Sequence, residues 1–260
     1  MSPLPSPITQ HRNCKKSYYG CVYPGTKGSH LAASLSRLSL HFEEAEHGMR
    51  DITDLVGGYK QFLDERYPQQ AELYRALAEN GQSPKTMIIA CCDSRADPSV
   101  IFSAGPGEIF VVRNVANLVP PYEPEGDYHG TSAALEFAVN GLEVETILVM
   151  GHARCGGINA FLAGLHDPKE NPGFIESWMS LLNPAREEVL KLARGKSKEE
   201  LQQAVEHTSI RRSLENLMTF PWIQERVADG RLNLRGAYFD IADATLLALD
   251  PETGEFNPLD

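Results

Sequence analysis

Three side chains suited to metal or acid–base chemistry stand at alternate positions at the end of an apolar run. In the stretch IIACCDSRADP, Cys91 ends the run and is followed by Asp93 and Arg95. A second apolar run ends in GHARCGG, which carries His152 and Cys155. Two thiolates and one imidazole suit Zn²⁺ in a catalytic site, in which water or substrate takes the fourth coordination position.

The two motifs lie too far apart in sequence for a zinc finger, so they share a metal ion only if the fold joins them. Both follow a predicted strand, and the carboxyl ends of parallel strands meet at one edge of a sheet. Gly156 and Gly157 allow close backbone approach and open a helix whose N-terminal amides favour an anion. Cys92 should point away from the metal, since side chains alternate along a strand. A cysteine at a strand end, or an HxxC motif, is usually structural when it occurs alone. Their occurrence together, at the ends of two predicted strands, favours a zinc site.

The strands that position these motifs are predicted from three short runs rich in β-branched and aromatic residues: 86–91, 109–114 and 146–152. We expect them to be parallel and buried on both faces. The other elements are expected as helices over 131–142, 174–195 and 209–227, and closing strands over 234–241 and 245–250. This alternation predicts an α/β fold with a mostly parallel central sheet flanked by helices.

The chain before the first strand divides into two parts. Helical spacing over 59–67 and 69–80, interrupted by Pro68, predicts an N-terminal helical arm over 49–80, ahead of a catalytic domain over 81–260. Residues 1–48 form an appendage that we expect to be disordered or processed. Two alternatives are that Met49 is the true start, or that the appendage is an organellar transit peptide.

The composition excludes several classes of protein. The chain lacks an apolar run of the roughly 18 residues needed to cross a bilayer, so we expect no membrane span. A formal charge of -11 and a pI of about 5.2 argue against nucleic acid and anionic membranes as partners. The odd count of five cysteines favours free thiols in a reducing compartment. We therefore expect a cytoplasmic protein, or an organellar one if the appendage is a transit peptide.

Five stretches occur in an order that resembles the β-class carbonic anhydrases, particularly their plant-like branch: ACCDSRADP, VVRNVANLVPP, GTSAALEFAV, GHARCGG and SLENLMTFPWI. The resemblance extends from about residue 81 to about residue 250. It implies that Cys91, His152 and Cys155 hold one Zn²⁺ per chain, and that Asp93 and Arg95 form an acid–base dyad beside it. The implied enzyme is a carbonate dehydratase, a lyase that reversibly hydrates carbon dioxide to bicarbonate and a proton by zinc-bound hydroxide. A homodimer or a dimer-based homotetramer is also implied.

The resemblance further assigns three residues to substrate binding. Gln82 matches a glutamine that reaches bicarbonate across the dimer, Phe110 matches an aromatic wall of the pocket, and Gly156 lies beside the metal. Phe137 departs from the pattern, because plant enzymes commonly carry tyrosine there. The resemblance also implies an open resting state in which Asp93 is paired with Arg95 rather than bound to the metal.

Two other functions are compatible with parts of this pattern. A hydrolase of carbon disulfide or carbonyl sulfide could keep the same zinc set and dyad. A thiol-redox or structural zinc-binding module would use Cys91, Cys92 and Cys155 for exchange or folding. The pair of Asp93 and Arg95 argues against that module, because a structural site needs no dyad.

Overall fold

The computed structural model of the chain describes residues 51–125, 129–164 and 173–259. By its internal contacts the chain divides into two units, residues 1–55 and 56–260. The predicted appendage, residues 1–48, lies outside the described residues, so its extent remains a prediction. None of the described helices combines the length and apolar character that a membrane span requires.

The elements of the described residues alternate between helices and strands. The α-helices are α1 Ile52–Gln61, α2 Tyr67–Asn80, α3 Pro98–Ile101, α4 Gly130–Glu136, α5 Gly156–Gly164, α6 Phe174–Met179, α7 Arg186–Leu192, α8 Lys198–Leu217 and α9 Pro221–Ala228. The π-helical segments are η1 Phe62–Arg66 and η3 Phe137–Gly141, and the 3₁₀ segments are η2 Val115–Asn117 and η4 Ser180–Ala185. The strands are β1 Thr86–Cys91, β2 Ile109–Asn114, β3 Thr146–His152, β4 Asn233–Phe239, β5 Leu246–Leu249 and β6 Phe256–Pro258.

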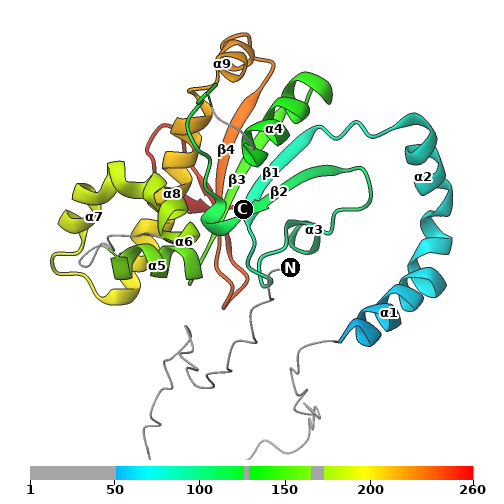
Figure 1. Ribbon diagram of the computed structural model, residues 1–260, viewed down its shortest axis with the longest axis horizontal. Coiled ribbons are helices and arrows are strands. Elements are labelled where there is room, and N and C mark those ends of the chain that lie inside the picture. Colours follow the sequence, from blue (N-terminus) through cyan, green and yellow to red (C-terminus); the bar gives the residue numbers. More distant parts are fainter. Residues whose placement is uncertain (1–50, 126–128, 165–172, 260) are drawn as a thin grey trace, which may run out of the picture. The chain divides into compact units, whose positions relative to one another are not determined.

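The strands of the described residues form one six-stranded sheet in the order β2-β1-β3-β4-β5-β6 (Figure 1). The first four strands in this order are parallel, whereas β5 and β6 join antiparallel at one end. This confirms the predicted α/β fold with a mostly parallel central sheet. The strand β6 was not predicted from the sequence, because three residues are too few to show an alternating pattern.

The core lies on both faces of the sheet, and β1 contributes to each face in alternation. Met87 and Ile89 belong to a cluster with side chains of β3, α4, η3, α8 and α9. Ile88 and Ala90 belong to a smaller cluster with side chains of β3, β4 and α3. A third cluster lies where the strands end and joins Cys91 to side chains of α5, α6, α7 and α8. The end of β1 is therefore embedded in apolar packing.

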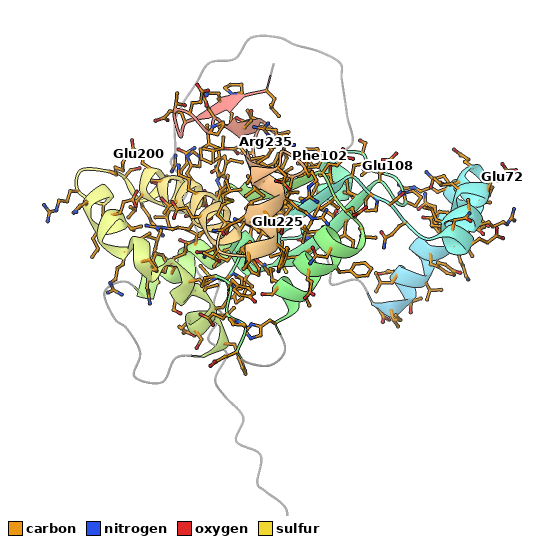
Figure 2. The ribbon with its side chains drawn as sticks, turned by 90° about the horizontal axis from the view of Figure 1, so that it is seen from above. Glu72, Phe102, Glu108, Glu200, Glu225 and Arg235 are labelled. Atoms are coloured by element: carbon orange, nitrogen blue, oxygen red, sulfur yellow. The ribbon has the colours of Figure 1, made fainter. Side chains whose placement is uncertain are left out.

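Two exposed carboxylates mark the outer surface of the described helices. Glu72 of α2 and Glu200 of α8 are exposed and stand at the outside of the side-chain view in Figure 2. Glu200 also completes the N-terminus of α8, because its carboxylate accepts a hydrogen bond from the backbone N–H of Ser197. This reciprocal cap explains why α8 begins well before the predicted helix over 209–227.

Two further expectations from the sequence are wrong. The strand β2 is half-buried along its whole length rather than buried on both faces, because it pairs only with β1 at an edge of the sheet. The stretch 174–195 is not one helix but passes through α6, η4 and α7. Pro184 lies inside η4, where its missing N–H and its ring disfavour a continuous α-helix.

Pro68 does not break the helical arm as predicted. The helical path continues from α1 through η1 to α2, and Pro68 sits in the first turn of α2. In η1 the backbone N–H of Tyr67 bonds to the carbonyl of Phe62, five residues earlier. We attribute the π turn to the proline, since its ring would clash with the carbonyl four residues earlier in a regular helix. Gly81, with φ of 80°, ends α2 as expected.

Candidate metal centre and active site

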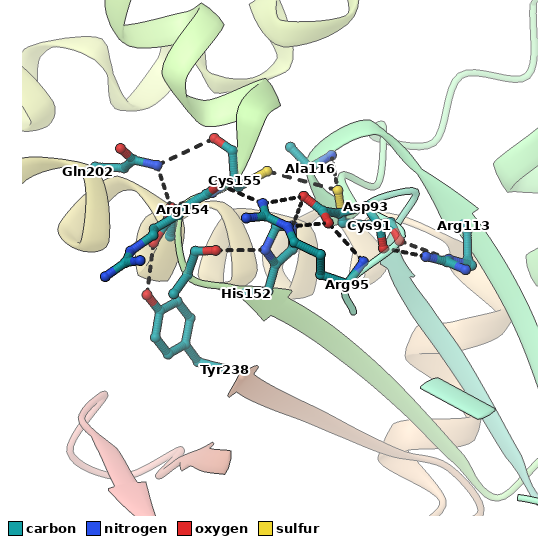
Figure 3. A network of polar contacts seen from close by, with 12 residues as sticks. Cys91, Asp93, Arg95, Arg113, Ala116, His152, Arg154, Cys155, Gln202 and Tyr238 are labelled. Carbon is teal, nitrogen blue, oxygen red and sulfur yellow. Dashed lines mark hydrogen bonds and ion pairs between the residues drawn. The ribbon is translucent and has the colours of Figure 1, made fainter. Parts of the chain in front are cut away.

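The ends of β1 and β3 bring the two sequence motifs together. These strands are parallel neighbours, with Ala90 opposite Met150. Cys91 and His152 therefore leave the sheet at the same edge, and Cys155 follows directly before α5. The candidate ligand atoms of the three residues all lie within 4.8 Å of one another (Figure 3).

The geometry of this cluster fits a zinc ion. The Sγ atoms of Cys91 and Cys155 are 3.9 Å apart, and two sulfurs bound to one tetrahedral zinc at ~2.3 Å stand roughly 3.8 Å apart. The Nδ1 of His152 lies 2.8 Å from the carbonyl oxygen of Ala153, which fixes the ring. The Nε2 of His152 is buried and lacks a hydrogen-bond partner among the described residues. Among the described residues no fourth candidate ligand lies in this group, so a tetrahedral zinc ion would keep one coordination position for a small molecule.

The thiols of Cys91 and Cys155 are joined by a hydrogen bond in which either sulfur can be the donor. The hydrogen bond between Cys155 and Cys91 lowers the pKa of the Cys91 thiol to about 4. The same hydrogen bond, together with burial, raises the pKa of Cys155. A divalent cation would replace the proton of this hydrogen bond and bind both sulfurs, because zinc binds the thiolate form.

The turn that carries Cys155 is tight. Arg154 has φ of 56°, a left-handed conformation that few residues other than glycine adopt. At Gly157 a side chain is excluded, since a Cβ would lie 2.7 Å from Cγ1 of Val115. Gly156, in contrast, faces open space, so the close approach predicted for both glycines holds only for Gly157.

Asp93 and Arg95 form a bidentate ion pair. Nε of Arg95 donates to Oδ1 of Asp93 at 2.9 Å, and Nη2 donates to Oδ2 at 2.7 Å. These hydrogen bonds lower the pKa of Asp93 to about 2. The carboxylate stands beside the ligand cluster, because its Oδ2 is 3.8 Å from Nε2 of His152. The pair predicted from the sequence is therefore present, with the carboxylate ionised and turned toward the cluster.

A second arginine, Arg113 of β2, holds the backbone around the dyad. Its Nε donates to the carbonyl of Cys91 at 2.9 Å and its Nη2 donates to the carbonyl of Asp93 at 2.6 Å. Its Nη1 forms an ion pair with Asp97 at 2.6 Å. The sequence analysis missed Arg113, because its role depends on the pairing of β2 with β1.

The sequence analysis also missed Glu206 and Gln202, which contact the backbone of Cys155, and Tyr238, which contacts Glu206. Glu206 accepts hydrogen bonds from the N–H of Cys155, from Tyr238 and from Gln202. The one available signal was the acidic residue within AVEHTSI, a stretch otherwise suited to the buried face of a helix.

Of the remaining predicted site residues, Gln82 and Phe110 do not join this cluster within the described chain. Gln82 is exposed, and no hydrogen bond to it is seen among the described residues. Phe110 lies opposite Met87, near the start of β2, whereas Asn114 at the end of β2 lies opposite Cys91. Its ring contacts that of Phe137, with centroids 5.8 Å apart. Gly156 is at the cluster as the first residue of α5.

Comparison with known proteins identifies the class to which this fold and site belong. A family model described as carbonic anhydrase matches residues 86–246. Among curated proteins, β-carbonic anhydrase 5 of Arabidopsis thaliana, a chloroplastic protein, is 43% identical over 74% of this chain and 64% of its own length. β-Carbonic anhydrase 3 of the same organism is 35% identical over 84% of each chain.

Solved structures give the same result. The β-carbonic anhydrase CcaA is 31% identical, with a TM-score of 0.75 over 80% of this chain and 92% of its own. A tetrameric β-carbonic anhydrase from Sordaria macrospora is 27% identical, with a TM-score of 0.64 over 76% and 96% of the two chains. The chain belongs to the β-carbonic anhydrase family.

Proposed function

We propose that the protein catalyses the reversible hydration of carbon dioxide to bicarbonate and a proton, with one zinc ion held by Cys91, His152 and Cys155. The observation that carries the proposal is the convergence of these three ligand atoms beside an ionised Asp93. Zinc in such a site lowers the pKa of a bound water toward about 7 and so supplies hydroxide at neutral pH.

The pair of Asp93 and Arg95 would orient the nucleophile. Asp93 accepts a hydrogen bond from the nucleophile and thereby directs a lone pair toward the carbon of the substrate. Arg95 keeps Asp93 ionised and, through its two hydrogen bonds, prevents the carboxylate from turning onto the metal. Gly156 is the first residue of α5, and its amide is proposed to bind the anionic product.

Gln82 is proposed to act on substrate from the neighbouring subunit, and Phe110 is proposed to line the substrate pocket. Both lack a contact with the cluster in the described part of one chain, and Gln82 is exposed. An aromatic wall formed by Phe110 and Phe137 suits a nonpolar gas. In an oligomer these side chains would complete the pocket that one chain leaves open.

Metal analysis combined with a carbon dioxide hydration assay tests the proposal. We expect about one zinc per chain and hydration activity that disappears when a chelator removes the metal. Parallel assays with carbonyl sulfide and carbon disulfide separate the hydrolase alternative. Zinc-loaded protein without hydration activity would overturn the proposal, and thiol–disulfide exchange by the metal-free protein would favour the redox module instead.

We further propose a homodimer or a dimer-based tetramer. Apolar side chains of the helices over 52–80 are exposed: Ile52, Leu55, Val56, Tyr59, Leu63 and Leu73. No residue of α1, η1 or α2 is buried within the described chain. The tetrameric relative from Sordaria macrospora supports assembly. Light scattering should give a dimer or tetramer for the whole chain, and an active monomer after removal of residues 1–80 would contradict the proposal.

A cytoplasmic location is proposed from the free cysteines Cys91, Cys92 and Cys155, which fit a reducing compartment. The chloroplastic relative keeps the organellar alternative open for residues 1–48. A fluorescent protein fused behind these residues tests both. Diffuse cytoplasmic signal supports the first, and import into an organelle supports the second.

A further inference from the structure

Glu206 places an ionisable carboxylate in the interior of the protein. The residue is 2% exposed and forms no ion pair among the described residues. Burial of a carboxylate is unfavourable unless hydrogen bonds replace its hydration. Three donors do so here: the N–H of Cys155 at 2.8 Å, the hydroxyl of Tyr238 at 2.8 Å and Nε2 of Gln202 at 2.9 Å.

These donors come from different elements, so the carboxylate ties the elements together. Gln202 lies one turn earlier on α8, whereas Tyr238 belongs to β4 and pairs with Gly151 of β3. The N–H of Cys155 belongs to the turn that follows β3. Figure 3 shows a dashed contact between Gln202 and Cys155, whereas the hydroxyl of Tyr238 bonds to the carboxylate of Glu206.

The peptide group between Arg154 and Cys155 is held at both ends. Its N–H donates to Glu206, and its carbonyl accepts a hydrogen bond of 3.3 Å from Nη2 of Arg95. A peptide group is planar and rigid, so these contacts set the direction in which the side chain of Cys155 leaves the backbone. Because Arg154 has φ of 56°, the turn would relax elsewhere without such restraint.

We propose that Glu206 is a positioning residue of the metal site, which acts through the N–H of Cys155 to hold its sulfur in place for zinc. The proposal rests on the proposed function only in taking Cys155 as a metal ligand. It predicts that loss of the carboxylate weakens metal binding beyond any general loss of stability.

Two substitutions in the full chain test this proposal. Glu206→Met keeps the side-chain volume but removes the acceptor, and we expect the Kd for zinc to rise roughly 10- to 100-fold, as for other residues that orient metal ligands. The thiolate-to-metal absorption band of the Co²⁺-substituted protein should shift at the same time. Glu206→Gln retains an oxygen that can accept from Cys155, so its zinc Kd should stay within a few-fold of wild type.

Ser213→Ala is the matched control. Ser213 is 1% exposed and its hydroxyl accepts from the N–H of Val119 and donates to the carbonyl of Asn117, but it touches no candidate ligand. This variant should lower the Tm and leave the zinc Kd and the cobalt band unchanged. A wild-type Kd and band in Glu206→Met, or an equal loss of affinity in Ser213→Ala, would overturn the proposal.

A fourth variant, Tyr238→Phe, covers the case in which Glu206→Met does not fold. Tyr238→Phe removes one hydrogen bond that orients the carboxylate, and we expect a several-fold rise in zinc Kd; an unchanged Kd overturns the proposal. Carbon dioxide hydration by the wild type is measured separately. Zinc binding without hydration activity would overturn the proposed function. It would not affect the proposed role of Glu206, which is tested by the Kd for zinc and by the thiolate-to-metal absorption band.

Discussion

Arg95 binds both carboxylate oxygens of Asp93, at 2.9 Å and 2.7 Å, and Asp93 in turn lies 3.8 Å from Nε2 of His152. The carboxylate therefore stands between a guanidinium and the candidate ligand atoms. Since the Arg95 hydrogen bonds lower the pKa of Asp93 to about 2, the group is ionised throughout the neutral range. One arginine thus sets both the charge and the direction of the carboxylate.

Replacement of Asp93 by asparagine should separate metal binding from catalysis. Asparagine has nearly the same shape but cannot form the bidentate ion pair or take up a proton. We expect Asp93→Asn to keep its zinc and to lose hydration activity by roughly 10²- to 10⁴-fold, the range typical of a positioned acid–base group. Stopped-flow hydration and metal analysis of the same preparation measure both quantities.

The control for this variant is Glu215→Gln. Glu215 forms an ion pair of 2.7 Å with Arg212 on the exposed side of α8, so the substitution makes the same chemical change away from the site. Its activity should equal that of the wild type. If Asp93→Asn also turned over at nearly the wild-type rate, Asp93 would have no part in the reaction.

Cys155→Ser should remove the metal. A serine hydroxyl is a far weaker zinc ligand than a thiolate, and Cys155 supplies one of two sulfurs in the cluster. We expect the zinc content of the purified variant to fall well below that of the wild type, with a lower Tm because metal binding contributes to folding. Cys92→Ser is the matched control, since Cys92 is exposed and lies outside the cluster. Full zinc content in Cys155→Ser would exclude Cys155 as a ligand.

The strands and their chemical motifs could be predicted from the sequence, because each is defined by a short continuous stretch of residues. Runs of β-branched residues define β1, β2 and β3, and the motifs of Cys91 and Cys155 directly follow two of them. The pairing of these strands is not local, so Arg113 and Glu206 could not be recognised as partners of the site. Pro68 misled the prediction for a different reason, since the local π turn before it accommodates a residue that usually ends a helix.

Acid should destabilise the protein through His207. Its ring packs against Tyr238 and Phe256, with centroids 4.5 Å and 4.1 Å apart, and burial together with the charge of Arg211 lowers the pKa of His207 to about 4. In the unfolded chain His207 becomes protonated below about pH 6.5, whereas in the folded chain it stays neutral until the pH falls to about 4. Stability that is complete above pH 6.5 is therefore lost as the pH falls, by on the order of 3 kcal/mol.

The variant His207→Phe tests this dependence, because phenylalanine keeps the aromatic packing and does not titrate. The Nε2 atom of His207 has no hydrogen-bond partner among the described residues, so the substitution removes no contact of that atom. We expect the Tm of the wild type to fall more than that of the variant between pH 7 and pH 5. Equal shifts in the two proteins would show that His207 does not titrate with unfolding.

Gln82→Ala should weaken the handling of substrate without affecting the metal. Gln82 is exposed and, in the described chain, contributes no hydrogen bond to the cluster, so we expect it to donate its amide to bicarbonate in the neighbouring subunit. Loss of one such hydrogen bond, worth on the order of 1 kcal/mol, should lower kcat/KM for bicarbonate by about fivefold. Zinc content and oligomeric state should not change. Gln224→Ala, at an exposed glutamine of α9, should leave kcat/KM unaltered; the same value in both variants would exclude Gln82 from the pocket.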